Sequence, residues 1–305
     1  MPTVYYRRLN PDMSQSPSPG HSRFETIGLI WKNSDPEVLQ SLHEVVEVLR
    51  GYSIRLLAAE QHDLFSAGEV STLPEMARQA DLIIPVGGDG TFIQTARHLS
   101  AFSGKLIGVN QGHLGFLADI QPDSIEATLN PVIQGQYLEE ERFLLEAKVI
   151  RNGKTLFECK ALNDVVVHKW SHIRMLQLET YVNGVFVHHY RSDGQIVSTP
   201  TGSTAYALSA GGPILYPTMD AMVLVPICPH RLSHRAITIS SDSKIDIKVC
   251  GKTPVNARVT CDGQDDFELC KNDIVKIRKS PHTLTILHPE GHDHFHLLRD
   301  KLGWG

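Results

Sequence analysis

The sequence of 305 residues lacks long apolar runs and large blocks of positive charge. Its nearest approach to a membrane-spanning segment, Ala221–Cys228, is short and interrupted by Pro226. The first residues lack the apolar core of a signal peptide. A net charge of -5, without any cluster of Lys and Arg, argues against nucleic acid or an anionic membrane as the main partner. These absences predict a cytoplasmic protein that binds neither.

Cysteine is scarce and shows no C-x-x-C spacing. The five residues are Cys159, Cys228, Cys250, Cys261 and Cys270. Because their number is odd, we expect reduced, buried thiols, without a disulfide framework or a zinc site. Histidine is frequent, with 16 residues. The four nearest the C-terminus are His288, His292, His294 and His296. Their spacing matches no zinc pattern, so we expect solvated side chains and predict no metal ligands.

Several common nucleotide signatures are also absent. No G-x-x-x-x-G-K-[ST] occurs, which excludes a P-loop. The turn around Gly88 and Gly90 lacks the third glycine of the dinucleotide fingerprint, and no acidic residue follows at the ribose-binding distance. Ser203 is not in a G-x-S-x-G elbow. Any phosphate chemistry in this chain therefore belongs to another class.

A glycine turn is the most informative local feature. The apolar run Leu82–Val86 reads as a buried strand, ends in Gly87-Gly-Asp-Gly-Thr91, and is followed by helical spacing from Phe92 to Ala101. Strand, turn and helix bring backbone N–H groups and a helix N-terminus to a phosphate. Asp89 cannot attract that phosphate, so it takes a proton or helps hold a metal. Alternatively, the turn is merely tight and Asp89 caps the helix. This stretch alone leaves both open.

The pattern along the chain predicts an α/β domain followed by a β-rich domain. Strand patterns at Thr26–Trp31, Ser53–Ala58, Leu82–Val86 and Lys105–Val109 alternate with helical patterns, which predicts a parallel sheet. From Phe143 onward, short β-branched runs are separated by turns, and Asn183-Gly184 is a strong hairpin signal. We expect a disordered tail at 1–22, the α/β domain with the glycine turn at 23–138, the β-rich domain at 139–280, and a terminal strand and helix at 281–305 that pack back on the first domain.

Three further segments carry candidate ligand contacts. The glycine loop Asn110–Leu117 follows the next strand, at the same end of the predicted sheet as the glycine turn. Asn163-Asp164 places an amide beside a carboxylate at a strand start, which suits nucleotide amino groups and hydroxyls. For these two, an ordinary loop and an Asx-type turn are the competing interpretations. Ser192–Pro213 is dense in small polar residues ahead of a short helix near Ser203, which favours ligand binding over packing.

Together these stretches resemble the NAD kinase family in its bacterial form, from about Thr26 to Trp304. The resemblance rests on four motifs in order, namely Gly87–Thr91, Gly108–Leu117, Leu162–Asp164 and Asp193–Pro213. The glycine turn alone is shared with lipid kinases of the diacylglycerol and sphingosine type and with phosphofructokinases. The order and spacing of all four motifs are specific. The family's fold, an α/β domain joined to a β-rich domain with NAD between them, agrees with the pattern above.

The resemblance implies transfer of the γ-phosphoryl group of ATP to the 2′-hydroxyl of the adenosine ribose of NAD, giving NADP, with Mg²⁺ accompanying ATP. Asp89 matches the catalytic base, and the residues matching ATP and phosphate contacts are Gly87, Gly88, Gly90 and Thr91. The residues matching NAD contacts are Asp89, Gly90, Asn163, Asp164, Arg174, Arg191, Asp193, Thr204, Ala205, Tyr206, Ala207, Leu208, Ser209 and Gln264. The family implies a homodimer or homotetramer. The alternatives are a lipid kinase with the same turn, disfavoured by the absence of a basic membrane patch, and a non-catalytic NAD(P) sensor.

Overall fold

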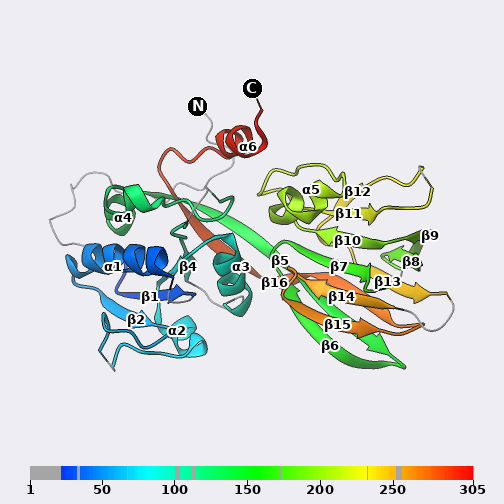
Figure 1. Cartoon of the computed structure of the whole chain (residues 1–305), viewed down its shortest axis with the longest axis horizontal. Helices are drawn as coiled ribbons and strands as arrows, with labels where there is room; N and C mark the ends of the chain where they lie inside the picture. Colours follow the sequence, from blue (N-terminus) through cyan, green and yellow to red (C-terminus); the bar gives the residue numbers. More distant parts are fainter. Residues whose placement is uncertain are drawn as a thin grey trace. The chain divides into compact units, whose positions relative to one another are not determined.

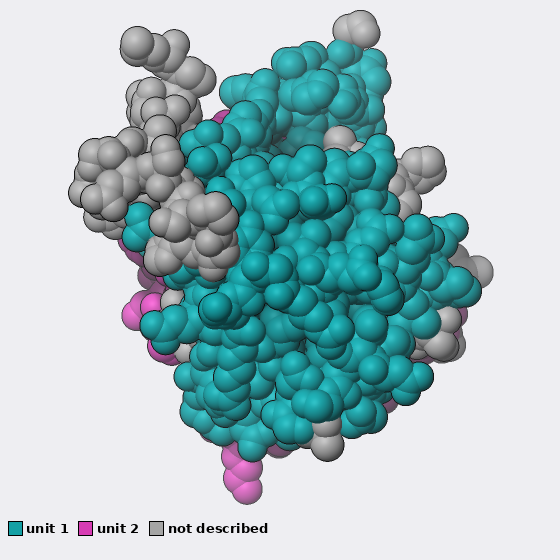
Figure 2. All heavy atoms as spheres, turned by 90° about the vertical axis from the view of Figure 1, so that its left-hand side faces the viewer, with its two compact units in different colours: residues 1–141, 284–305 teal, residues 142–283 magenta. Residues whose placement is uncertain are grey.

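A computed structural model describes residues 22–32, 35–66, 68–99, 104–111, 115–171, 174–231, 233–251 and 256–304. The expected tail therefore lies outside the described residues, apart from Ser22. The chain divides into two compact units, unit 1 with residues 1–141 and 284–305 and unit 2 with residues 142–283 (Figure 2). Among the described residues, no helix is long and apolar enough to cross a membrane. Figure 1 labels the elements of each unit.

Unit 1 is built on a parallel sheet with strand order β2-β1-β3-β4-β16. The strands are β1 Thr26–Trp31, β2 Arg55–Ala58, β3 Leu82–Val86, β4 Lys105–Leu106 and β16 Ile274–Pro289, whose last residues belong to this unit. Ile27 pairs with Leu82, and Lys105 pairs with Thr285, both in parallel register. The end of the chain thus contributes a strand to the N-terminal sheet, and the predicted fold class, an α/β domain plus a β-rich domain, is confirmed.

The helices of unit 1 follow the capping and spacing signals of the sequence. They are α1 Pro36–Arg50, α2 Leu73–Gln79, α3 Asp89–His98, the short 3₁₀ helix η1 Pro122–Ser124, α4 Ile125–Ile133 and α6 His294–Leu302. Val38, Leu42, Val45 and Leu49 are buried along one face of α1, because positions three and four apart share a helix face. The Asp35 side chain caps α1 by accepting the N–H of Glu37 at 3.0 Å. Ser34-Asp-Pro-Glu37 has the sequence pattern of a capping box, but Ser34 lies outside the described residues.

Unit 2 consists mainly of antiparallel strands. They are β5 Tyr137–Arg151, which begins in unit 1, β6 Lys154–Ala161, β7 Asp164–Lys169, β8 Leu176–Val182, β9 Val185–Ser192, β10 Gly194–Ser198, β11 Ala221–Ile227, β12 Ile237–Ser240, β13 Ile245–Cys250, β14 Ala257–Cys261 and β15 Asp265–Leu269. One sheet has the order β12-β11-β10-β7-β14-β15. Asn183 and Gly184 join β8 to β9 with φ of 53° and 79°, as the hairpin signal predicts. β10 and β11 carry no alternating pattern because both are buried on both faces.

The expectation that all cysteines are reduced is wrong. Cys159 in β6 and Cys261 in β14 form a disulfide, although 102 positions separate them in the sequence. Both side chains face the same apolar core of unit 2, where packing brings the two strands together. Cys228 and Cys270 are exposed, so the expected burial is wrong for them as well. Spacing along the chain carries no signal for a contact that tertiary packing creates.

The expectation of solvated C-terminal histidines is also wrong for most of them. The His288 side chain is only 1% exposed, and those of His292 and His294 are buried too. Only His296, on α6, fits the prediction, with its side chain 63% exposed. The reason is that β16 enters the sheet of unit 1, which carries the residues after it into packed surroundings. His288 and His292 both lie beside the carboxylate of Asp119.

Candidate functional site

The glycine turn connects the buried strand β3 to the first residue of α3. The Gly87 N–H donates to the carbonyl oxygen of Val109 at 2.9 Å, which fixes the turn to the segment after β4. Gly87 has φ 152°, and a Cβ there would lie 2.6 Å from Thr91 Oγ1, so a side chain does not fit without a shift. Gly88 is the N-cap of α3. This geometry places the positive end of a helix dipole at the turn, which suits an anion.

The carboxylate of Asp89 joins the two predicted glycine loops of unit 1. Oδ2 accepts the backbone N–H of Phe116 at 2.9 Å, and Oδ1 accepts that of Leu117 at 3.2 Å. A Cβ on Gly115 would overlap Asp89 Oδ1, so glycine permits this approach. Residues 112–114 of the second loop lie outside the described residues. Two accepted hydrogen bonds orient the carboxylate and leave lone pairs for a further partner.

In unit 2, the pair Asn163-Asp164 is held in place by a residue that the sequence did not single out. The Asp262 carboxylate accepts the backbone N–H groups of Leu162, Asn163 and Asp164 at 2.8, 2.8 and 3.0 Å. The Asp262 N–H in turn donates to the carbonyl oxygen of Asp164 at 3.0 Å. Asp262 has φ 52°, a turn conformation that the following Gly263 also adopts. The Asp-Gly dipeptide is the only sequence signal that marks this position.

The Asp164 side chain and the side-chain oxygen of Asn163 are both buried. Within the described part of the chain, Asn163 Oδ1 is buried without a hydrogen-bond partner. Asp164 is 5% exposed. Burial, and then the negative charge of Asp262, raise the pKa of Asp164 to about 7. A buried polar group without a partner is costly, and both groups are therefore suited to a polar ligand.

The segment Thr199–Ser209 packs directly against Asn163. The Thr199 hydroxyl donates to the carbonyl oxygen of Leu162 at 2.5 Å, and the Gly202 N–H donates to Thr199 Oγ1 at 3.1 Å. A Cβ on Gly202 would overlap the Asn163 carbonyl group. The 3₁₀ helix η2, Thr201–Thr204, and the short helix α5, Tyr206–Ser209, follow from this contact. The predicted helix near Ser203 is therefore present in this form.

Tyr206, Asp164 and Asp193 share one electrostatic environment. The Tyr206 side chain is on the surface, with 47% of the residue exposed. Burial of its hydroxyl, and then the nearby Cys228, Asp164 and Asp193, raise the pKa of Tyr206. Asp193 forms an ion pair with Lys169 at 2.7 Å. The exposed aromatic ring offers a stacking face, and the two carboxylates offer hydrogen-bond acceptors.

The remaining predicted NAD contacts differ in how well they fit this arrangement. Thr204 is the last residue of η2 and Ala205 lies between η2 and α5. Ala207, Leu208 and Ser209 are in α5, and Ala207 is fully buried. Gln264 is exposed in the turn before β15, with its N–H donating to the Cys261 carbonyl oxygen. Arg191 and Arg174 are exposed, and within the described residues Arg174 takes no part in the Asp164 hydrogen bonds.

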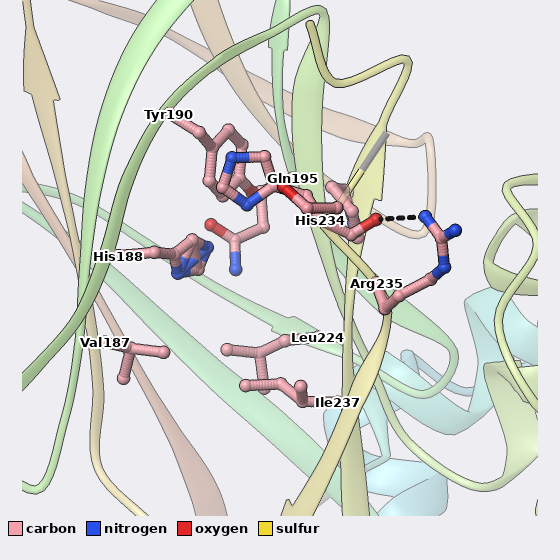
Figure 3. Close-up of a pocket in the computed structure, with 10 residues that line it drawn as sticks. Val187, His188, Tyr190, Gln195, Leu224, His234, Arg235 and Ile237 are labelled. Carbon is pink, nitrogen blue, oxygen red and sulfur yellow. Dashed lines mark hydrogen bonds between the residues drawn. The ribbon is translucent and has the colours of Figure 1, made fainter. Parts of the chain in front are cut away.

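A separate cavity of about 240 Å³ lies elsewhere in unit 2. Figure 3 shows it between His188, Tyr190, His234 and Ile237, with the His188 and Tyr190 rings stacked at a centroid distance of 4.3 Å. Burial, and then the neighbouring His234 and His189, lower the pKa of His188 to about 4. Its described lining includes none of the residues predicted to contact NAD or ATP. The cavity is therefore distinct from the predicted site.

An α/β unit with a glycine turn at a helix N-terminus, followed by a β-rich unit with buried, unmatched polar groups, defines a nucleotide-binding protein of two domains. The family model described as the ATP-NAD kinase N-terminal domain matches residues 27–137. The model described as the ATP-NAD kinase C-terminal domain matches residues 162–288. The chain therefore belongs to the NAD kinase family, a family of phosphotransferase enzymes.

Relatives and solved structures agree with this assignment. The chain is 46% identical over 284 residues to an NAD kinase of Nitrosomonas europaea, covering 92% of this chain and 95% of the relative. An NAD kinase from Archaeoglobus fulgidus, solved in complex with ATP, is 25% identical with a TM-score of 0.71, covering 91% of this chain and 98% of that one. Yeast NADH kinase, solved with NADH, shares the fold at a TM-score of 0.82 and 22% identity, covering 92% and 88%.

Proposed function

We propose that this protein is an ATP-dependent NAD kinase, which transfers the γ-phosphoryl group of ATP to the 2′-hydroxyl of the adenosine ribose of NAD and gives NADP. The observation that carries the proposal is the Asp89 carboxylate, which two backbone N–H groups orient at the first residue of α3. Membership of the NAD kinase family, with relatives named NAD kinase, supports the substrates.

Asp89 is the proposed general base. A ribose hydroxyl is a weak nucleophile, and a carboxylate that accepts its proton during attack lowers the barrier. The hydroxyl oxygen forms a bond to the γ-phosphorus, the bond to the bridging oxygen breaks, and ADP leaves with the electron pair. The proton passes to Asp89 and then to solvent. Within the described part of the chain Oδ1 and Oδ2 each accept one backbone N–H, and a carboxylate oxygen has two lone pairs, so one is left for this proton.

The glycine turn is proposed to bind the phosphates of ATP. Gly87, Gly88, Gly90 and Thr91 surround the N-terminus of α3, where backbone dipoles favour negative charge. The Asp89 carboxylate is also a hard oxygen donor of the kind that Mg²⁺ takes beside substrate phosphates. Mg²⁺ bound with ATP would supply positive charge that offsets the negative charge developing during transfer. The turn itself orients the phosphates for attack.

Unit 2 is proposed to recognise NAD. Asn163 Oδ1 is an unmatched acceptor for an amino group or hydroxyl, and Asp164 can accept or donate because its pKa is about 7. The exposed Tyr206 ring provides a stacking face, and Asp193 a further acceptor. Their supports in the chain, Asp262 and Thr199, position the backbone of the pair without being candidate ligand contacts themselves. Further contacts with NAD are proposed from the resemblance alone, and they involve Arg191, Thr204, Ala205, Ala207, Leu208, Ser209, Arg174 and Gln264.

The kinase proposal is tested by Asp89→Asn. The variant keeps the shape of the side chain but lacks a proton-accepting carboxylate, so we expect kcat to fall by on the order of 10²–10⁴ while the Kd for NAD stays within a few fold. Asp123→Asn, at an exposed carboxylate in η1, is the matched control and should keep full activity. Turnover is measured as NADP formed from ATP, Mg²⁺ and NAD, and folding by circular dichroism.

Other outcomes would point to the alternatives. Phosphorylation of a diacylglycerol or sphingosine instead of NAD would favour a lipid kinase. Tight NAD or NADP binding without any turnover in the wild type would favour a sensor. Loss of NAD binding in a folded Asp89→Asn protein would make Asp89 a ligand-holding residue and refute its role as base.

We also propose a homo-oligomer. β9 and β12 are edge strands of their sheets, and they expose apolar side chains, with Phe186 at 53% and Val185 at 68%. Exposed apolar edges favour pairing with a second copy. Phe186→Lys should shift the mass seen by light scattering toward the monomer, whereas Phe295→Lys, an exposed aromatic on α6, should not. A monomeric wild type at micromolar concentration would refute the proposal.

A further inference from the structure

Unit 1 contains a buried cluster that the proposed reaction does not use. Asp119 follows the segment that orients Asp89, while His288 lies near the end of β16 and His292 in the turn before α6. The side chains of Asp119, His288 and His292 are 7%, 1% and 6% exposed. Within the described part of the chain, these three form a group with the composition of a metal site.

The donor atoms converge on one point. Asp119 Oδ2 lies 2.5 Å from His288 Nδ1 and 3.2 Å from His292 Nδ1, and all three atoms lie within 4.8 Å of one another. In a tetrahedral site with metal–ligand bonds of about 2.1 Å, donor atoms are roughly 3.4 Å apart. The distance to His292 already meets this spacing. Asp119 and His288 would have to move apart by about 0.9 Å to reach the same spacing.

The turn after β16 holds the two rings together. The His292 N–H donates to the carbonyl oxygen of Pro289 at 3.1 Å, and Gly291 has φ 92°, where L side chains are strained. The ring centroids of His288 and His292 are 4.0 Å apart. The turn thus brings the backbone of His292 back toward the end of β16, beside His288.

A second carboxylate lies behind His288. Glu140 Oε2 is 3.6 Å from His288 Nε2, and both side chains are 1% exposed. Metal-bound histidines commonly direct their second ring nitrogen to a carboxylate, which orients the ring. A dication would balance the two negative charges of Asp119 and Glu140, and buried charges are stable when they are paired or bind a metal.

We propose that Asp119, His288 and His292 bind one Zn²⁺ or a similar divalent transition-metal ion, with Glu140 as a positioning residue. Nitrogen donors from imidazole favour Zn²⁺ over Mg²⁺ or Ca²⁺, which prefer an all-oxygen set. The ion would tie the end of β16 to Asp119, two residues after Leu117, whose N–H orients Asp89. The binding site stands on its own geometry and does not rest on the proposed kinase reaction.

The test uses the tag-free full-length chain, stripped with a chelator and titrated with Co²⁺, whose visible ligand-field bands report tetrahedral coordination. We expect one ion per chain with such bands, displaced by Zn²⁺. His292→Ala should abolish the bands. His292→Cys, which keeps a ligand, should retain binding and add a sulfur-to-cobalt charge-transfer band. Glu140→Gln should weaken binding by on the order of 10–100-fold.

His296→Ala is the matched control. His296 is exposed on α6, and in the described part of the chain its ion-pair partner is Asp300. It should titrate like the wild type. Absence of stoichiometric binding to the wild type, or unchanged bands in His292→Ala, would overturn the proposal. If His292→Ala does not fold, the wild-type titration and the charge-transfer band of His292→Cys decide it. NADP formation by the same wild-type preparation is measured separately, so failure of either proposal is seen by itself.

Discussion

Replacing Asp164 with asparagine should change how protein stability depends on pH. The folded protein holds the Asp164 proton up to about pH 7, because burial and then Asp262 raise its pKa from the ordinary 3.8. In the unfolded chain the proton leaves near the ordinary value. The stability that this carboxyl group contributes is therefore fully present below pH 3.8 and is lost as pH rises through 7. Protonated Asp164 therefore stabilises the folded protein at acidic pH.

The size of the effect follows from the shift. One pKa unit corresponds to about 1.4 kcal/mol, so the full loss is about 4 kcal/mol and the part between pH 5 and pH 8 is about 3 kcal/mol. Asp164 is 5% exposed, so solvent screening is weak. The Asp164→Asn variant has no titrating group at this position, so it does not lose stability in this way as the pH rises. Its free energy of unfolding, relative to the wild type, should rise by about 3 kcal/mol from pH 5 to pH 8.

Urea unfolding at four pH values between 5 and 8, followed by circular dichroism, measures this difference. Asp242→Asn, at an exposed carboxylate of unit 2, is the control and should give a constant difference from the wild type. Parallel curves for the wild type and Asp164→Asn would refute the reasoning. If NAD hydroxyls donate to the ionised carboxylate, the wild-type affinity for NAD also increases up to about pH 7 and then levels off, and that of Asp164→Asn does not.

Two further predictions concern the supports of this site. Gly202→Ala should lower the free energy of unfolding by about 1–3 kcal/mol and weaken NAD binding, because the new Cβ overlaps the Asn163 carbonyl group. Urea unfolding measures the stability and calorimetry measures the Kd for NAD. An unchanged Kd for NAD would contradict this prediction. Cys159→Ser should cost about 2–4 kcal/mol in the same unfolding assay, because it removes the link to Cys261. Denatured, unreduced wild type should titrate three thiols, and a result of five would show that the disulfide does not form in solution.

The sequence predicts well those features that local chemistry determines. Thr72-Leu-Pro-Glu75 has the sequence pattern of a capping box and forms one at the start of α2, with the Thr72 N–H donating to Glu75 Oε2 at 3.0 Å, because both partners lie within one helical turn. The Asn183-Gly184 turn forms because only a few residues tolerate two successive positive φ angles. The buried run Leu82–Val86 followed by glycines likewise becomes a strand and a helix start. Each signal spans a few residues.

Contacts between distant segments leave no comparable pattern. Cys159 and Cys261 meet because two strands face one core, and Asp119 meets His288 because β16 joins the sheet of unit 1 from 169 positions away. Neither spacing is periodic or short. The role of Asp262 is hidden for the same reason, since its partners lie about a hundred residues earlier. Residues that carry chemistry are therefore easier to predict from the sequence than the residues that hold them in place.

In both units, a carboxylate accepts the backbone N–H groups of a loop at the proposed ligand site. A loop that must bring backbone and side chains to a ligand has N–H groups without partners in regular structure, and these must be satisfied if buried. In unit 1 the carboxylate of Asp89 accepts two such N–H groups, and in unit 2 that of Asp262 accepts three. The difference lies in what else each carboxylate does. Asp262 holds the backbone of the Asn163-Asp164 pair in place, whereas Asp89 stands at the glycine turn itself. Asp262→Asn should therefore impair folding and NAD affinity together, while Asp89→Asn should impair turnover first.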